Sequence, residues 1–268
     1  DAGNLPRVDP ETMHGLVIDD RTCWTLEVRA DATRGNEERY KIYVQHNSYL
    51  YDQQARAYTH LNLDSKNTSK IDEKREFMCE NFFDIRLFGA VMSTTEYNCG
   101  QVRGPVQFTF ARSADPIVPL YITITRVALT KPGEKPEAAE ENEDMTPTHG
   151  TMCRKALVPY GLYRGHGFFT PKFAQVTGCT EEDIALFWEA LQKMWDLDHS
   201  ASRGLMSCRG LYVFSHEKGL GNAPAHKLFE QIVVKRKEGV EAPRKFDDYT
   251  IELDEQNLPS GVTLTRLV

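Results

Sequence analysis

Two stretches of the chain alternate apolar and polar side chains with a period of two, and this alternation constrains the fold more than any other feature of the sequence. The first stretch covers residues 106–111 and the second covers residues 118–125. Alternation of this kind is typical of strands that bury one face. Helical spacing occurs at residues 68–83, behind Thr68 or Ser69 as a cap, and after the capping sequence at residues 180–183. Few helices, several strands and long insertions predict an α+β fold.

The length of the chain bounds its organisation. A chain of 268 residues suits one large domain or two small ones and can bury a core without disulfide bonds. No internal repeat divides it, and we interpret residues 1–268 as a single domain. Further strands are expected at residues 210–214 and 231–235, with a last strand or two after residue 249.

Composition points to a soluble cytoplasmic protein. Hydrophobic residues make up 40% of the chain and charged residues 26%, as in ordinary globular proteins. No apolar run approaches the roughly 18 residues of a membrane-spanning helix, and the first seven residues lack the apolar core of a signal peptide. The six cysteines form no C-x-x-C pair. We therefore expect reduced, mostly buried thiols, no zinc site and no membrane contact.

Charge is distributed unevenly along the sequence. The net charge is -7, but residues 133–144 alone carry six carboxylates and one lysine. The flanking residues 97–132 and 145–180, called here the carboxylate-poor segment, hold one carboxylate, Asp115. One interpretation is chance clustering, with the arginines paired to acids on neighbouring elements. The other is a surface on which a polyanion lies. The eight basic residues of the segment are Arg103, Arg112, Arg126, Lys131, Arg154, Lys155, Arg164 and Lys172.

Local signatures of common enzymes are missing. The sequence has no phosphate-binding P-loop, no G-x-S-x-G and no H-E-x-x-H. The sequence from Gly219 begins like the G-x-G-x-x-G motif of dinucleotide-binding proteins, but Pro224 stands at the position of the third glycine. The proline ring would obstruct the close packing of helix on strand that this position serves. Asp9, Asp19, Asp20 and His14 form a small acidic group that could hold Mg²⁺, although such residues more often form turns and helix caps. We expect no cofactor.

Two segments suit contact with a nucleic-acid backbone. Gln101 and Arg103 lie in a glycine-flanked bend before a strand, where the backbone can approach a ligand and the guanidinium suits phosphate. The alternative is a hairpin with a solvated arginine. Arg154 and Lys155 are followed by aromatic and basic residues, as in proteins that bind single strands, although tyrosines in strands are usually core or sheet surface. Those following residues are Tyr160, Tyr163 and Arg164.

Five sequence motifs, spread over nearly the whole chain, carry a family resemblance. They are DAGNLPRVDPET at residues 1–12, FGAVM at 88–92, CGQVRGPVQ at 99–107, VPYGLYRGHG at 158–167 and LGNAPAHKLF at 220–229. Together they resemble the backbone subunit family of the type I-C CRISPR Cascade complex, a Csd-type CRISPR-associated protein.

The resemblance implies a modified RRM-like (ferredoxin-like) palm with inserted finger and thumb regions. It implies that residues 124–158 form a thumb-like hairpin containing the acidic loop 133–144. It also implies a subunit without catalytic activity that polymerises head to tail along a CRISPR RNA, with target DNA and the other Cascade subunits as further partners.

Two departures from the family pattern limit what is carried over. The family's first strand is missing before Asp1, so we expect the palm to lack an element. The family has a lysine- and arginine-rich helix after residue 17, whereas only Arg21 and Arg29 are basic in residues 18–29. No RNA contact is therefore assigned to that segment.

The sequence thus predicts a CRISPR RNA-binding subunit rather than an enzyme. One alternative is a metal-dependent RNA-cleaving relative that uses an acidic residue such as Asp9. Another is a protein-only scaffold, which would carry no nucleic acid when purified. The predicted RNA-binding residues are Gln101, Arg103, Arg126, Arg154, Lys155, Tyr160 and Arg164.

Overall fold

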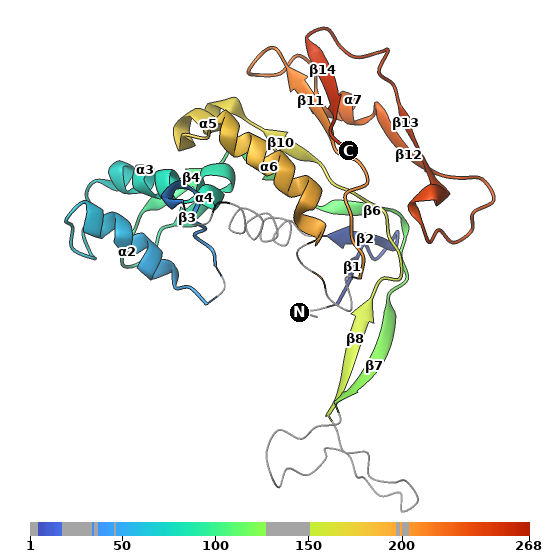
Figure 1. Ribbon diagram of the computed structural model, residues 1–268, viewed down its shortest axis with the longest axis horizontal. Coiled ribbons are helices and arrows are strands. Elements are labelled where there is room, and N and C mark those ends of the chain that lie inside the picture. Colours follow the sequence, from blue (N-terminus) through green and yellow to red (C-terminus); the bar gives the residue numbers. More distant parts are fainter. Residues whose placement is uncertain are drawn as a thin grey trace, which may run out of the picture.

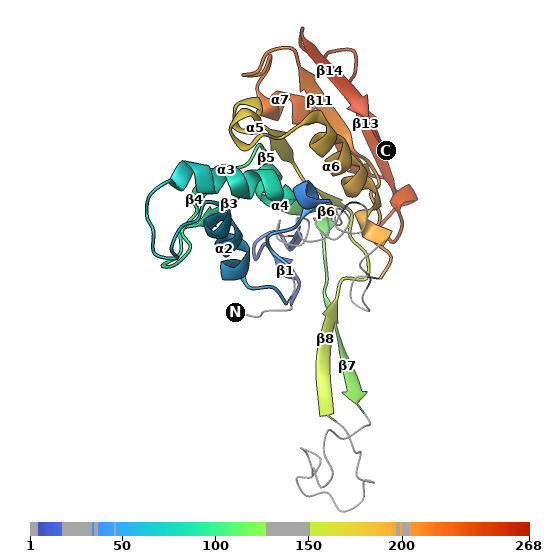
Figure 2. The ribbon, with the colours of Figure 1, turned by 60° about the vertical axis from the view of Figure 1, so that its left-hand side comes forward.

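The computed structural model describes residues 5–17, Arg34, residues 37–45, 47–126 and 151–196, His199, and residues 204–268. Helices and small antiparallel sheets are mixed along the chain, which confirms the predicted α+β class. A long hairpin projects from the body of the molecule in both views (Figures 1 and 2). The predicted segments 18–29 and 133–144 lie outside the described residues.

A four-stranded antiparallel sheet has the order β1-β2-β6-β9. The first alternating stretch forms β5 and reaches the start of β6 at Ala111, so the strand predicted over residues 106–111 is interrupted at residues 109–110. The ribbon of β6 and β9 continues into a further strand pair, because the Thr109 N–H donates to the His166 carbonyl at 2.9 Å between the two pairs. The strands are β1 (Arg7–Val8), β2 (His14–Val17), β6 (Ala111–Pro116) and β9 (Tyr163–Arg164), followed by the pair β5 (Val106–Phe108) and β10 (Gly167–Phe169).

The second alternating stretch forms the projecting hairpin. β7 (Leu120–Arg126) pairs with β8 (Thr151–Leu157), from Leu120 opposite Leu157 to Arg126 opposite Thr151. Pairing begins at Leu120 rather than near residue 124. The two strands run side by side away from the sheet in both views (Figures 1 and 2).

A group of helices and one short hairpin lies on the opposite side of the body from the C-terminal strands (Figure 1). After η1 (Glu38–Tyr40) it consists of α2 (Leu50–His60), α3 (Ile71–Asn81), α4 (Phe83–Phe88), β3 (Gly89–Met92) and β4 (Gly100–Arg103). The predicted cap of α3 is wrong, because its N-cap is Lys70 in a left-handed conformation. Ser69 instead donates its backbone N–H and its hydroxyl to the Asn67 side chain.

The predicted capping box at residues 180–183 is confirmed. The Thr180 side chain accepts from the Asp183 N–H, and the Asp183 carboxylate accepts from the Thr180 N–H at 2.8 Å. This box opens α6 (Glu181–Lys193), which follows α5 (Pro171–Thr177) and precedes η2 (Met194–Asp196). The C-terminal part consists of β11 (Tyr212–His216), α7 (Ala225–Phe229), β12 (Ile232–Arg236), η3 (Phe246–Asp248), β13 (Tyr249–Leu253) and β14 (Val262–Arg266).

Two hydrophobic clusters form the core. One gathers α6 and α4 around Phe83, Leu87 and Phe187. The other gathers α2 and α3 around Tyr58 and Met78. Because α4 contributes to both clusters, it ties the two together. Burial of these side chains supplies most of the driving force for this arrangement.

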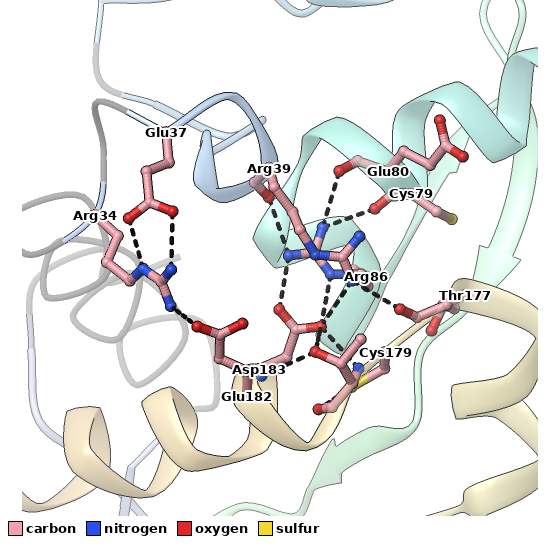
Figure 3. Close-up of polar contacts among 12 residues, drawn as sticks. Arg34, Glu37, Arg39, Cys79, Glu80, Arg86, Thr177, Cys179, Glu182 and Asp183 are labelled. Carbon is pink, nitrogen blue, oxygen red and sulfur yellow. Dashed lines mark hydrogen bonds and ion pairs between the residues drawn. The ribbon is translucent and has the colours of Figure 1, made fainter.

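A buried ion pair holds α4 against the start of α6 (Figure 3). Arg86 and Asp183 have side chains with no solvent exposure and meet through two hydrogen bonds of 2.9 and 2.8 Å. Arg86 also donates to the carbonyls of Cys79 and Arg39. Burial by itself would raise the pKa of the Asp183 carboxyl, but the hydrogen bonds and charge of Arg86 hold that pKa below its usual range. The pair is therefore ionised and fully hydrogen-bonded at neutral pH.

Candidate nucleic-acid interface

The outer face of the β3–β4 hairpin carries two of the predicted residues. The register places Val91 opposite Gln101 and Gly89 opposite Arg103, so these four residues share one face of the hairpin. Gln101 and Arg103 are exposed. The opposite face, which includes Met92, packs into the core. The hairpin is thus a platform anchored in the core through one face, and its other face presents both polar side chains outwards.

Arg103 ends β4 instead of lying in a bend before a strand. The following turn depends on Gly104, where an added Cβ would lie 2.2 Å from the Leu87 carbonyl oxygen. The Arg103 guanidinium lies 5.8 Å from the centre of the Phe173 ring on α5. The Gln101 carbonyl accepts a 3.2 Å hydrogen bond from Arg75. Sequence reasoning missed Arg75 and Phe173, because neither lies near the motif along the chain.

The projecting hairpin carries three more predicted residues. Arg154 faces Thr123 and Lys155 faces Ile122 across the ladder, so the two cations point to opposite faces of the hairpin. Arg154 is exposed and Lys155 is half-buried. Arg126 ends β7, and its side chain lies outside the described part of the structure. One hairpin face is therefore polar beside Arg154, and the other combines Lys155 with apolar residues.

Tyr160 and Arg164 are engaged with the C-terminal part of the chain. The Tyr160 ring stacks on Tyr249, with 6.4 Å between ring centres and 23° between planes. Arg164 is half-buried, and its guanidinium donates to the Phe229 carbonyl at the end of α7. Burial lowers the pKa of Arg164. These contacts give Arg164 a structural role, so its guanidinium is less free to bind a ligand than that of the exposed Arg103 or Arg154.

The sole carboxylate of the carboxylate-poor segment lies beside the hairpin that β12 forms with β13. Asp115 lies 3.3 Å from the Arg236 guanidinium. Burial raises the pKa of the Tyr249 phenol, and a hydrogen bond with Asp115 raises it further. The negative charge of Asp115 is thus matched within the protein.

The cations of this segment differ in whether they have partners. Arg112 pairs with Asp9 at 2.6 Å, as chance clustering would require. Arg103, Arg154 and Lys155 form no ion pair with any described carboxylate. Three exposed or half-exposed cations therefore remain uncompensated in a protein of net charge -7.

The structure does not gather the predicted residues into one cluster. In both views β4 lies beside the helices, whereas β7 and β8 project away from the body of the molecule (Figures 1 and 2). Gln101 and Arg103 form one patch, and Arg154 and Lys155 lie on the separate hairpin. A single ligand that touches both patches must be extended.

The acidic group proposed as a metal site is only partly described. Asp9 accepts the backbone N–H groups of Glu11 and Thr12, which lowers the pKa of its carboxyl, and it pairs with Arg112. These are the contacts of a turn-forming aspartate. Asp19 and Asp20 lie outside the described residues. Within the residues that the structure covers, no group of three His, Cys, Asp or Glu side chains is arranged to hold a metal.

No helix in the described part of the chain has the length and apolar character to span a membrane.

The fold is that of an α+β protein with a projecting hairpin, and its exposed cations without ion-pair partners favour an anionic ligand. The chain belongs to the family described as CRISPR-associated protein Cas7, whose sequence model matches residues 1–254. A search of curated proteins finds no match. Among solved structures, the chain is similar to one described as "CRISPR RNA-guided surveillance complex, pre-nicking", with 12% identity and a TM-score of 0.49 over 81% of this chain and 74% of that one.

Proposed function

We propose that this protein is a CRISPR RNA-binding backbone subunit of a type I-C Cascade surveillance complex in the cytoplasm. Membership of the Cas7 family supports this proposal. The observation that carries it is the set of exposed cations without carboxylate partners on β4 and β8, in a chain whose net charge is -7. Such cations favour a polyanionic ligand, and the four-stranded sheet would form part of an RRM-like palm.

The proposed contacts are to the guide backbone rather than to its bases. Arg103 offers a planar fork that suits phosphate, and Gln101 adds a polar neighbour on the same platform. Arg154, Lys155 and Arg126 would contact phosphates from the hairpin. Because phosphate contacts do not depend on base identity, one subunit can bind any spacer sequence.

Copies of the protein would lie head to tail along one guide, because only heterologous contacts generate an open array. Target DNA and the other Cascade subunits would join this array. The subunit would bind and position nucleic acid without catalysing a reaction. The contacts of Asp9 within its turn and with Arg112 favour this role over the RNA-cleaving alternative.

The test is the salt dependence of guide binding. For single strands the slope of log K against log salt is about -0.7 per neutralised phosphate. Replacing Arg103, Arg154 or Lys155 by Ala should each flatten the slope by roughly 0.7 per bound subunit. A control variant must replace a cation that does not contact the guide. Lys172 of the carboxylate-poor segment is a poor choice, because the next residue, Phe173, has its ring beside the Arg103 guanidinium. Lys218, exposed in the turn after β11, is a better one and should leave the slope unchanged.

Two results would count against the proposal. An unchanged slope for all three variants would mean that these cations do not follow the guide. An absorbance ratio at 260 and 280 nm typical of pure protein, for material purified from cells that express a guide, would favour the protein-only scaffold.

A further inference from the structure

An arginine rests on an aromatic ring in the C-terminal part of the molecule, away from β4. The Arg209 guanidinium carbon lies 4.3 Å from the centre of the Phe246 ring. Arg209 belongs to the segment before β11, and Phe246 is the first residue of η3. Arg209 is exposed and Phe246 is half-buried. The ring thus supports a guanidinium that remains accessible.

The same surface holds further cations that form no ion pair. Arg244 and Lys245 are exposed just before η3, and like Arg209 they form no ion pair with a described carboxylate. Lys235 and Arg236, in the adjoining strand, are instead paired with Glu252 and Asp115. The cations beside Phe246 therefore differ from those of β12 in having no carboxylate in an ion pair among the described residues.

Two carboxylates lie close by, and one of them is used to build the loop. Asp248 accepts the backbone N–H groups of Arg244 and Lys245 at 2.8 and 3.1 Å, which fixes the loop in front of η3. Asp247 is exposed. Asp248 is thus committed to backbone hydrogen bonds, and neither Asp247 nor Asp248 forms an ion pair with Arg209, Arg244 or Lys245 within the described residues.

This surface adjoins the base of the projecting hairpin through Tyr160. Tyr160 stacks on Tyr249, the residue that directly follows η3, so its ring lies close to the end of the element that carries Phe246. Burial raises the pKa of the Tyr160 phenol, and the charge of Arg209 opposes that shift. Tyr160 also follows β8 by three residues. Rings, a supported guanidinium and exposed cations thus occur in one part of the molecule, near the point where β8 ends.

We propose that Arg209, supported by Phe246 and next to Tyr160, forms a base-stacking site for single-stranded nucleic acid, with Arg244 and Lys245 as phosphate contacts. Unstacked bases bind to aromatic rings and to guanidinium planes, whereas phosphates bind to the charge of either cation. The site therefore recognises bases, unlike the contacts proposed for Arg103. This inference rests on the proposed function only where it names guide RNA and target DNA as the candidate nucleic-acid strands.

The experiment compares a normal RNA oligonucleotide with an abasic one of the same length. Arg209→Ala should weaken binding of the normal RNA at least about fivefold, in line with the loss of one stacked base. It should weaken binding of the abasic RNA clearly less. Arg209→Lys keeps the charge and loses the plane, so it should resemble Arg209→Ala on the normal RNA. Equal losses on both RNAs, or no loss on either, would overturn the stacking site.

A matched control lies in the same part of the chain. Arg266 also lies over a ring, 5.8 Å from the centre of Tyr212, and donates to the Val268 carbonyl. Arg266→Ala should leave both affinities unchanged. A melting temperature equal to that of the unmodified protein confirms that each variant is folded. An Arg266→Ala loss equal to that of Arg209→Ala would mean that cation removal alone explains the effect.

A further experiment determines whether guide RNA or target DNA occupies the site. It uses the assembled complex and a fluorescent adenine analogue whose emission is quenched by stacking. The analogue is placed along the guide in one arm and along the target strand in the other. Arg209→Ala should relieve quenching in one arm, and relief in neither would overturn the inference. If Arg103→Ala weakens binding while Arg209→Ala does not, the proposed function stands and this site fails. The reverse result keeps the site and removes the proposed guide contacts.

Discussion

Arg86 and Asp183 are charged residues buried at the junction of the two hydrophobic clusters. Moving two charges out of water is costly, and the cost is offset only when nearly every donor and acceptor finds a partner. Arg86 meets this condition through both oxygens of Asp183 and the carbonyls of Cys79 and Arg39. Asp183 also closes the capping box of α6. One carboxylate therefore fixes both a helix start and the packing of α4 against it.

We expect Asp183→Ala to lower the free energy of unfolding by about 3–5 kcal/mol, because it leaves the buried charge of Arg86 without a partner. Urea denaturation of the purified protein at neutral pH measures this difference. Lys193→Ala serves as the control, since Lys193 pairs with Glu189 on the exposed side of α6. Surface pairs of that kind contribute at most about 1 kcal/mol. Equal losses for the two variants would contradict a special role for the buried pair.

The pH dependence of stability follows from the same carboxyl. The pKa of Asp183 in the folded protein lies below the value of about 3.9 expected in the unfolded chain. Its contribution is therefore fully present above that unfolded value and is lost as the pH falls through the folded pKa. The unmodified protein should lose more stability on acidification from neutral pH than Asp183→Asn does. A parallel loss in both proteins would assign acid sensitivity to other groups.

At the scale of elements, strand register decides which side chains share a face. The β3–β4 register places Gln101 and Arg103 together on the outer face, whereas the β7–β8 register separates Arg154 from Lys155. The connection between β7 and β8 contains residues 133–144, which lie outside the described residues and carry a net charge of -5 in sequence. We infer that this loop does not contact the guide, because phosphates and carboxylates repel each other.

Deletion of residues 133–144 should leave guide affinity intact, with a slight gain at low salt where repulsion is least screened. Titration of labelled RNA at low and at physiological salt measures the effect. A second variant, in which a neutral Gly/Ser segment of equal length replaces the loop, separates charge from length. A large loss of affinity in both variants would show that the loop contributes to binding.

At the scale of the whole molecule, the projecting hairpin exposes an apolar face. Leu120, Ile122 and Ile124 alternate along β7, and each side chain is nearly half exposed, at 47%, 45% and 46%. An apolar face held away from the body cannot be covered by it (Figure 1). In the proposed head-to-tail array, a neighbouring copy would cover these three apolar side chains, and Lys155 on the same face would remain in contact with the guide.

Mass photometry with guides of increasing length should therefore resolve species that grow in steps of one subunit, 30.6 kDa. Ile122→Ser should reduce the number of copies on a long guide and leave binding of one copy to a short guide unchanged. Val233→Ser is the matched control, because Val233 is a partly exposed apolar residue of β12. A closed dimer as the largest assembly on every guide would contradict the array.

The sequence determined the features that depend on local periodicity and short-range hydrogen bonding. Alternation along residues 106–111 and 118–125 predicted strands, and Thr180 with Asp183 predicted a capping box; the structure contains both. These succeed because backbone geometry couples side chains that are two, three or four positions apart. The predicted cap of α3 was wrong for a reason that is also local. Ser69 donates its N–H and its hydroxyl to the Asn67 side chain and does not cap the helix. The uneven charge is also a property of sequence alone.

Tertiary structure decided which charged side chains are free to bind a ligand. Arg112 is matched by Asp9, Arg164 by the Phe229 carbonyl and Asp115 by Arg236, and each pair joins residues at least 65 positions apart. No local pattern encodes such partners, because they meet only when separate elements pack. The same packing left Arg103 and Arg154 uncompensated and placed Arg209 on Phe246. The sequence thus specified the cations, and long-range contacts selected which of them remain available for nucleic acid.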